Sequence, residues 1–534
     1  MHKNRLAFAA ALIAALSAAG SAAAADYDVK RLLPGSPFHG VHGLRFDKDD
    51  NLYAASVIGE SIYKIDPATK KVITFIAPPQ GMADDLAFAP DGTLAWTSIE
   101  DGILHIKSPH GPIRMLMEHQ RGVNGVSFSR DGKRLFVSLV FYGDALYEVD
   151  RNGVKPPRLI LKDMGGLNGF EVGADGMIYG PLWFKGKIVR INPDTAKMDV
   201  IAEGFKTPAA VKLDFKGFAY TPDTGTRELI RVNLKTGQKK VIAKLRSDLD
   251  NLAFNSKGKL FVSLSHLNAI DEVDVTTGQV KPFIPAGKLT STAGLAVATA
   301  AGHDTLYVGD VFGGVRKVNG DTGAVTDTPV DMFQPSHISL SAKHVTVVGQ
   351  VNGFVQRFDR ATFKKLGEWN GFKSPGDAIE APNGDILVAE TGSGNLVRIT
   401  GPRPTDRKIV ASGLAGPVGL AWAGNDAVYV SETRAGQVSR IDLKSGEKNL
   451  VAPRLESPEG LAVAPDGAIL VVEAGAKRVT RLDLKKAMRS IIAANLPIGL
   501  GNGPSLYRGI AVSPTAIYIN SDIENSIYKI TPRK

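Results

Sequence analysis

The sequence of 534 residues contains no cysteine. The protein therefore has no disulfide, no thiolate metal site, no thiol nucleophile and no cysteine that could carry a lipid near the N-terminus. Long apolar runs are also missing, because no segment after residue 25 approaches the roughly 20 apolar residues that a membrane-spanning helix needs. We therefore expect a chain without a transmembrane segment that is stabilised by packing alone.

A concentrated charge of one sign is missing as well. The 64 basic and 54 acidic residues leave a net charge of +10, and the basic residues are scattered in small pairs such as Lys70-Lys71 and Lys239-Lys240. A nucleic-acid-binding protein would more often gather lysine and arginine on one stripe with aromatic residues between them. The sequence therefore predicts no nucleic-acid partner.

Residues 1–25 have the pattern of a secretory signal peptide. Lys3 and Arg5 precede the short apolar stretch LAFAAALIAAL, and three alanines ending at Ala25 precede Asp26. A basic start, a short apolar stretch and small residues at the end are typical of a segment that is cleaved on export. We expect cleavage after Ala25 and a periplasmic or secreted protein.

One pattern recurs along the rest of the chain: a small or polar residue, Gly, an apolar-x-apolar triplet, Asp-Gly, and two further β-rich runs. Clear copies begin at Asn124, Asn168 and Glu459. The first apolar residue of each copy falls at Leu44, Leu86, Val126, Phe170, Val211, Leu252, Leu295, Ile338, Ala378, Leu420, Leu461 and Ile510. The Asp-Gly pairs are typical of tight hairpin turns. Repeats of 40 to 45 residues that contain only strands are typical of β-propeller blades, of which a ring usually has four to eight. The twelve copies therefore predict an all-β protein of two six-bladed propellers.

The chain ends suggest how the rings close. The segment at Tyr27 resembles a fourth strand without its first three, and the segment at Ile527 is a third strand with nothing after it. A second unassigned fourth strand follows Gln279, and we expect it to complete the twelfth unit so that no sheet edge stays open. This interpretation predicts a first propeller over residues 26–277 and a second over residues 278–534.

The residue just before Gly in each unit stands where the chain enters the innermost strand, at one mouth of the central tunnel. We call these six positions in each ring the mouth column. In the first ring the mouth column is His42, Asp84, Asn124, Asn168, Ala209 and Asp250. In the second it is Ala293, Ser336, Gly376, Val418, Glu459 and Arg508. Because the ring brings a column to one axis, the five polar residues of the first ring predict a metal or ligand site there. Asn-Gly is also a common turn dipeptide, so a purely structural role remains the alternative.

These repeats resemble the six-bladed superfamily of gluconolactonases (the senescence marker protein group), paraoxonases, strictosidine synthase relatives, NHL repeats and streptogramin lyases. The second half is most similar to NHL repeats and lyases, as in the segments at Glu390 and Ser431. The resemblance implies calcium at the mouth of the first ring, with Asn124, Asn168 and the pair Asp250-Asn251 matching its ligands. Two features differ from the family pattern: His42 replaces the expected first-blade glutamate, and the Asp-Asn pair comes two units after Asn168 instead of one. Zinc or manganese is therefore an alternative to calcium. The full predicted ligand set is His42, Asp84, Asn124, Asn168, Asp250 and Asn251.

The loops between second and third strands would build the rest of that mouth. In the first ring they carry Phe141, Tyr142, Trp183, Phe184, Asp223 and His266. Of these, Tyr142, Trp183, Phe184 and Asp223 are the predicted substrate pocket, because aromatic residues over a polar floor suit a small organic ligand. His266 is the predicted acid or base, with His39 as a second candidate, since imidazole titrates near neutrality.

Four acids of the second ring, Asp310, Glu390, Glu432 and Glu473, occupy one repeated position at the end of the second strand. We expect each to accept backbone N–H groups in its own loop, as NHL-type repeats do, because four like charges on one tunnel would repel. No GxSxG, P-loop, HExxH or dinucleotide fingerprint occurs in a supporting context, so no organic cofactor is predicted.

These observations favour an exported metal-dependent hydrolase, resembling lactonases, that acts on a lactone or ester in the first ring. The cation would polarise the carbonyl, while Asp250 would bind it and help to activate water. The alternative is a noncatalytic exported binding or scaffold protein whose rings bind a protein or polysaccharide. A third possibility is a metal-dependent lyase resembling streptogramin lyase, with the second ring taking part.

Overall fold

The computed structural model describes residues 26–311, 313–330, 334–500 and 507–533. The predicted signal peptide, residues 1–25, lies outside the described residues. The strands form twelve four-stranded antiparallel sheets, and the chain divides into two compact units. We call Pro37–Gly287 propeller 1, and Lys288–Lys534 together with the N-terminal segment up to Ser36 propeller 2. Within the described residues no helix is long and apolar enough to cross a membrane.

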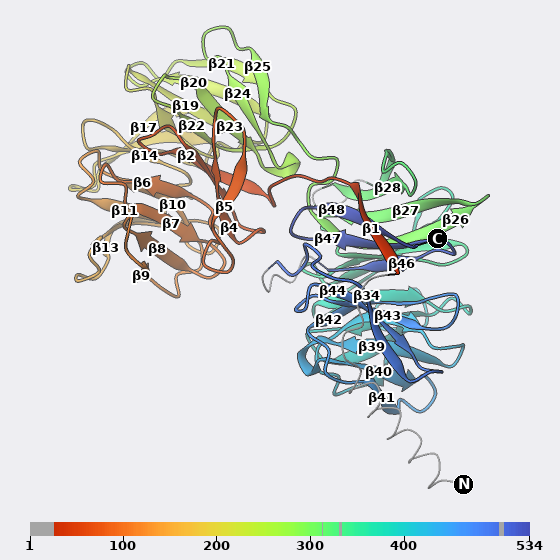
Figure 1. Cartoon of the computed structure of the whole chain (residues 1–534). Helices are drawn as coiled ribbons and strands as arrows, with labels where there is room; N and C mark the ends of the chain where they lie inside the picture. The colour runs from red at the N-terminus through yellow and green to blue at the C-terminus, as the bar shows by residue number, and fades with distance from the viewer. Residues whose placement is uncertain (1–25, 312, 331–333, 501–506, 534) are drawn as a thin grey trace. The chain divides into compact units, whose positions relative to one another are not determined.

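Propeller 1 is built from six consecutive sheets, which we number as blades 1 to 6 (Figure 1). Their strands are β2 (Val41–Phe46), β3 (Leu52–Ser56), β4 (Ser61–Ile65), β5 (Val72–Ile76); β6 (Leu86–Phe88), β7 (Leu94–Ser98), β8 (Ile103–Lys107), β9 (Ile113–Met117); β10 (Val123–Phe128), β11 (Leu135–Leu139), β12 (Ala145–Val149), β13 (Arg158–Lys162); β14 (Glu171–Val172), β15 (Ile178–Leu182), β16 (Lys187–Ile191), β17 (Met198–Glu203); β18 (Lys212–Leu213), β19 (Phe218–Asp223), β20 (Glu228–Asn233), β21 (Lys239–Lys244); β22 (Leu249–Phe254), β23 (Leu260–Leu264), β24 (Ala269–Val273) and β25 (Val280–Ile284). A short 3-10 helix, η1 (Ser265–Leu267), lies between β23 and β24.

Propeller 2 holds blades 7 to 12. Their strands are β26 (Thr292–Ala300), β27 (His303–Asp310), β28 (Gly314–Asn319), β29 (Val325–Val330); β30 (His337–Leu340), β31 (His344–Gly349), β32 (Phe354–Asp359), β33 (Lys365–Asn370); β34 (Pro375–Glu380), β35 (Ile386–Glu390), β36 (Asn395–Ile399), β37 (Arg407–Ala411); β38 (Pro417–Trp422), β39 (Ala427–Glu432), β40 (Gln437–Asp442), β41 (Lys448–Ala452); β42 (Pro458–Val463), β43 (Ile469–Glu473), β44 (Arg478–Asp483), β45 (Met488–Ala493); β46 (Ile510–Val512), β47 (Ile517–Ser521), β48 (Ser526–Pro532) and β1 (Tyr27–Leu33). A second 3-10 helix, η2 (Thr433–Ala435), follows β39.

The repeat pattern and its turns are confirmed. The first apolar residue of every unit is buried, and these residues help to form the apolar clusters of the blades. The hairpin turns use the predicted Asp-Gly chemistry: in blade 3, Gly132 has φ +71°, and the Asp131 carboxylate accepts the N–H of Lys133. A side chain at Gly132 would be strained by this φ. The two six-bladed propellers therefore follow from the local sequence.

The predicted ring closure and domain boundary are wrong. The segment at Val280–Ile284 completes blade 6 by pairing with β24, and it does not complete the twelfth unit. Instead β1 pairs antiparallel with β48, with Tyr27 opposite Pro532, so the red strand lies beside the blue one in Figure 1. The ranges 26–277 and 278–534 are therefore replaced by Pro37–Gly287 for propeller 1, and by residues up to Ser36 plus Lys288–Lys534 for propeller 2.

Chain proximity explains the correction. A short turn joins β24 to β25, in which the Asp274 carboxylate accepts the N–H groups of Thr276 and Thr277, and Gly278 adopts φ +77°. The next strand along the chain, β25, therefore pairs with the edge of β24. β48 lies at the end of the chain, so its edge is paired by a strand from the other end.

Candidate functional site

The two mouths of each tunnel are named here by the chain segments that reach them. The strand-start mouth lies where the first strand of each blade begins, and the hairpin-turn mouth lies where that strand ends. The predicted site in propeller 1 is at the strand-start mouth. In β2, β10 and β22 the register shifts just after the first residue, between Val41 and Leu44, Val123 and Val126, and Leu249 and Leu252. These β-bulges release the mouth-column residue from the regular ladder.

The glycine after the mouth-column residue is required by close approach between blades. A Cβ at Gly43 would lie 2.8 Å from the backbone oxygen of Asp84, and a Cβ at Gly125 would lie 2.8 Å from that of Asn168. Neither glycine has a positive φ. The Asn-Gly dipeptides are therefore not turns, and their glycines let the innermost strands of neighbouring blades come together.

Three mouth-column residues from three blades meet directly. The Nδ1 atom of His42 lies 2.8 Å from an Asp250 carboxylate oxygen and 3.4 Å from one of Asp84. All three side chains keep part of their surface exposed, 24% for His42 and Asp250 and 15% for Asp84. The predicted convergence of His42, Asp84 and Asp250 is thus seen in the structure, and the group is open to solvent at the mouth.

The charges within this group depend on one another. Burial alone would lower the pKa of His42, but the carboxylates of Asp250 and Asp84 outweigh burial and raise it to about 9. Burial raises the pKa of Asp84 to about 7, with the His42 charge opposing and the Asp250 charge adding to the shift. At neutral pH His42 is therefore an imidazolium that lies between two acids.

Asn124 and Asn168 occupy the equivalent positions of blades 3 and 4. Both are buried, and within the described residues their side-chain amides make no hydrogen bond to the protein. Each amide can donate and accept, so both remain available to a ligand at the mouth.

Asn251 makes hydrogen bonds between blades, and its predicted place among the metal ligands stays a prediction. Its amide donates to the Asp85 carboxylate at 3.2 Å and accepts the N–H of Leu252 at 2.8 Å. It stands at the position that glycine holds in blades 1, 3 and 4. Asn251 therefore joins blade 6 to blade 2 beneath the mouth.

The predicted cation at this mouth stays a prediction. Across the described residues no group of three or more His, Asp or Glu side chains is placed to hold a metal ion. The carboxylates of Asp84 and Asp250 instead share the His42 imidazolium, which supplies the positive charge.

The predicted aromatic loops do gather. Phe141 packs edge-on against Trp183 and Phe184, with ring centroids 5.5 and 5.8 Å apart, and Phe184 is 62% exposed. Tyr142 is exposed, and its ring lies under the Arg121 guanidinium at 3.9 Å. These loops join second and third strands of blades 3 and 4, so they stand at the same mouth as the mouth column.

Asp223 holds its own loop in place, and its predicted part in a substrate pocket stays a prediction. It is buried, and its carboxylate accepts the N–H groups of Lys206, Thr207 and Gly225. It is therefore the propeller 1 counterpart of the structural acids of propeller 2.

The two candidate acid–base histidines differ in exposure. His39 is fully buried, with Nδ1 3.3 Å from the Tyr63 hydroxyl, and so has no access to a substrate. His266 lies on η1 with 42% of its side chain exposed, and its Nδ1 is 3.0 Å from an Asp248 oxygen. The acid–base role of His266 stays a prediction.

The four acids of propeller 2 have the predicted structural role. The carboxylates of Asp310, Glu390, Glu432 and Glu473 accept the backbone N–H groups of Thr290, Lys373, Ala415 and Glu456. Each of these residues belongs to the loop that precedes its own blade, so the acids hold loops in place.

Sequence reasoning missed a buried polar group in propeller 2. His337 Nε2 lies 2.8 Å from an Asp377 oxygen, and the His337 ring packs edge-on against Tyr507 at 4.4 Å. Arg508 forms ion pairs with Glu459 and Asp522. His337 and Asp377 each follow a mouth-column residue by one position. A comparison of the mouth-column residues alone therefore does not include them. The sequence signal was the polar residue where other blades have glycine.

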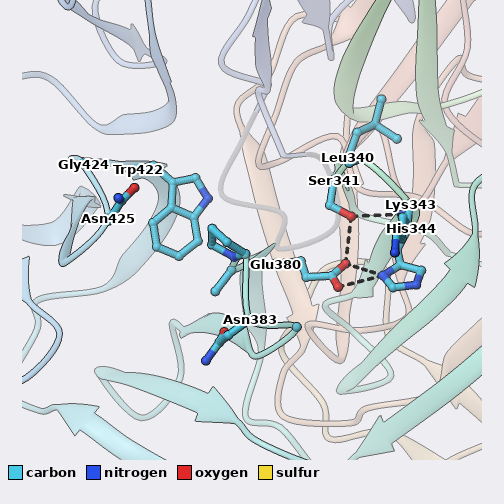
Figure 2. A pocket seen from close by; sticks show the side chains of 13 residues that line it. Leu340, Ser341, Lys343, His344, Glu380, Asn383, Trp422, Gly424 and Asn425 are labelled. Carbon is cyan, nitrogen blue, oxygen red and sulfur yellow. Dashed lines mark hydrogen bonds and ion pairs between the residues drawn. The ribbon is translucent and has the colours of Figure 1, made fainter.

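Two cavities were also missed, and both lie at hairpin-turn mouths. In propeller 2 a groove of about 770 Å³ passes the turns of blades 8, 9 and 10. Figure 2 shows Trp422 on one side of this groove and the hydrogen-bonded side chains of Ser341, Glu380 and His344 on the other. In propeller 1 a cavity of about 310 Å³ is lined by residues that include Arg45 and Glu171.

Comparison with known proteins supports the fold. No family model matches the chain, and no curated protein matches it in sequence. A GH74 xyloglucanase from Xanthomonas campestris is similar in structure, with a TM-score of 0.54, 13% identity and coverage of 95% of this chain and 100% of that chain. A GH74 enzyme from Niastella koreensis has a TM-score of 0.53, 12% identity and coverage of 94% and 99%. A virginiamycin B lyase from Staphylococcus aureus has a TM-score of 0.30 at 16% identity and covers 61% of this chain and 95% of its own. The two GH74 structures match nearly the whole chain and share with it the β-propeller fold.

Proposed function

We propose that this protein is an exported hydrolase that acts on a small ester or lactone at the strand-start mouth of propeller 1. The observation that supports this most is the meeting of His42, Asp84 and Asp250 at a mouth where Asn124 and Asn168 hold the equivalent positions of blades 3 and 4. The exposed aromatic rings of the neighbouring loops supply an apolar surface for the organic part of the substrate.

Each group has a chemical task in this proposal. The amide N–H groups of Asn124 and Asn168 donate to the substrate carbonyl oxygen and stabilise the oxyanion that forms. A carboxylate oxygen of Asp84 accepts a proton from water as the water oxygen bonds to the carbonyl carbon. The His42 imidazolium supplies positive charge and a proton for the alkoxide when the ester C–O bond breaks, and Asp250 orients the imidazole.

Substitution in the full-length protein tests the proposal. Hydrolysis of δ-valerolactone, γ-butyrolactone and p-nitrophenyl acetate is measured for the wild type, Asp250→Asn and Asp84→Asn. We expect a loss of kcat/KM of about 100-fold or more in both variants, since a positioned acid or base contributes this much. Asp49→Asn, which removes an exposed carboxylate in the turn between β2 and β3 at the opposite mouth, is the matched control and should keep full activity. Equal activity in all four proteins, or none in any, would refute the proposal.

A divalent cation is the other possible source of positive charge at this mouth. Calcium, or else zinc or manganese, would compete with the His42 proton for Asp84 and Asp250. Elemental analysis of protein purified without chelator decides whether the positive charge comes from the His42 imidazolium or from a bound cation. About one cation per wild-type chain, lost in Asp250→Ala, would support the metal-dependent form.

A second candidate function is the binding of a polysaccharide by propeller 2. The groove of about 770 Å³ offers the Trp422 ring, the amides of Asn383 and Asn425, and the Glu380–His344 pair (Figure 2). An aromatic face beside hydrogen-bonding groups suits a sugar ring. Retention in gels that contain soluble polysaccharides tests this function. Trp422→Ala should lose any retention, while Phe215→Ala in propeller 1 should not, and equal retention of both variants would contradict it.

A further inference from the structure

Two cationic side chains inside the tunnel of propeller 1 have donor groups without a partner. Lys212, at the start of β18, is only 1% exposed. In propeller 1, all of which the structure describes, its Nζ atom makes no hydrogen bond, and neither does the Nη2 atom of Arg45 on β2. The two residues lie close enough for the Arg45 charge to act on Lys212.

The acidic groups nearby are already engaged. The Asp85 carboxylate accepts the N–H groups of Leu86 and Val126 as well as the Asn251 amide. The Glu171 carboxylate accepts Arg45 Nη1 at one oxygen and the N–H of Leu213 at the other. Both acids therefore serve to join blades.

A buried ammonium group without a hydrogen bond is costly. Burial lowers the pKa of Lys212 to about 8, the Arg45 charge adds to this effect and the Asp85 and Glu171 charges oppose it, so the amine is still mostly protonated at neutral pH. A methionine of similar length would fill the same volume without a charge to desolvate. The lysine therefore keeps a positive charge close to Arg45, which favours an anion at this mouth.

A cavity opens beside Arg45 at the hairpin-turn mouth, and Lys212 is not among the residues that line it. It has a volume of about 310 Å³, within the range of small-ligand sites, and Arg45 and Glu171 are in its lining. Its walls are rich in phenylalanine: Phe46, Phe88, Phe128 and Phe215 line it. The Arg130 guanidinium stacks over the Phe215 ring at 4.4 Å, which adds positive charge at the rim.

We propose that the hairpin-turn mouth of propeller 1 binds a small organic carboxylate. The carboxylate pairs with Arg45, the buried positive charge of Lys212 strengthens its attraction, and the apolar part of the ligand packs on the phenylalanine rings. This site lies at the opposite end of the tunnel from the proposed hydrolytic site and uses different residues.

Binding of benzoate, phenylacetate and hexanoate to the full-length protein tests this inference by calorimetric titration at pH 7. The wild type should bind at least one of them, while benzamide, which has the same ring without the charge, should bind at least about tenfold more weakly. Lys212→Met should weaken binding by about tenfold or more and should leave the unliganded protein as stable as the wild type or more so. Phe215→Ala, at a half-exposed position that the fold does not need, should also weaken binding.

Lys133→Met is the matched control, because this exposed lysine lies in a turn of the same mouth outside the cavity lining. It should bind like the wild type. Equal binding by the wild type and Lys212→Met would overturn the proposal, and so would the absence of heat with all three carboxylates. Equal competition by chloride or sulfate at the same concentration would also overturn it, since that result indicates an unspecific anion only.

Discussion

At the scale of single residues, His42 decides what the strand-start mouth of propeller 1 can hold. Its imidazolium is the counter-ion of Asp84 and Asp250. The carboxylates of these two residues would otherwise repel each other, because they stand on either side of His42 and the charge of Asp250 acts on Asp84.

His42→Ala should therefore destabilise the protein and create a cation site. We expect a loss of about 1–3 kcal/mol in the free energy of unfolding, because the two acids lose their charged partner. Added calcium should recover part of this loss in the variant and should have little effect on the wild type. Urea unfolding with and without calcium chloride measures both effects. Equal stabilisation of the two proteins by calcium would show that the wild type itself binds the cation.

His105 makes the free energy of unfolding depend on pH. Its ring is stacked on Trp96 with centroids 4.9 Å apart, and burial lowers its pKa from 6.5 to about 4. The folded protein thus holds His105 neutral, while the unfolded chain takes up a proton below about pH 6.5. The stabilising contribution is complete above pH 6.5 and is lost as the pH falls toward 4.

His105→Phe keeps a stacked ring and removes this titration. Between pH 7 and pH 5 the free energy of unfolding should fall less in the variant than in the wild type. Urea unfolding at the two pH values gives the comparison, and the same pH dependence in both proteins would contradict the assignment.

The sequence revealed the mouth column but not the layer beneath it. His42, Asp84 and Asp250 could be predicted to meet because they hold one position in the repeat. Arg45 and Lys212 also share a repeated position, three residues further along, yet charged residues in strands usually face solvent. Only the structure shows that Lys212 is buried in the tunnel.

At the scale of strands, the repeat units were predictable and their closure was not. Each unit forms from consecutive residues joined by short turns, so its pattern is local. The fourth strand of the last blade comes from across the whole chain. Two segments, at Tyr27 and at Val280, have the composition of a fourth strand, and composition alone does not say which sheet each one joins.

Substitution of one buried residue in each closing segment tests the corrected topology. Leu33 of β1 packs with Leu289 and Leu306 in propeller 2, while Ile284 of β25 packs with Phe38 and Val41 in propeller 1. Leu33→Ala and Ile284→Ala should each cost about 2–5 kcal/mol, as expected for a truncated core residue. Differential scanning calorimetry should show that Leu33→Ala lowers the transition of propeller 2 and Ile284→Ala that of propeller 1. If Leu33→Ala instead lowered the transition of propeller 1 and Ile284→Ala that of propeller 2, the ring closure predicted from the sequence would be correct.

At the scale of the whole molecule, the two propellers differ in what they need to fold. Propeller 1 is continuous in sequence, from Pro37 to Gly287, and all six of its sheets are formed within that range. Propeller 2 contains strands from both ends of the described chain.

Separate fragments should show this difference. Residues 37–287 should fold alone with a cooperative thermal transition. Residues 288–534 should fold less stably, and a peptide of residues 26–36 added in trans should raise their midpoint, because it supplies β1. Circular dichroism during heating is the measurement, and a midpoint that the peptide leaves unchanged would argue against closure by β1.

The most direct test of the central proposal combines the fragment with the site. Hydrolysis of the best ester or lactone substrate is measured with residues 37–287 alone, with and without Asp250→Asn. We predict that the fragment keeps the kcat/KM of the full-length protein and that Asp250→Asn removes the activity. Activity that persists in the variant, or that requires propeller 2, would contradict a hydrolytic site at the strand-start mouth of propeller 1.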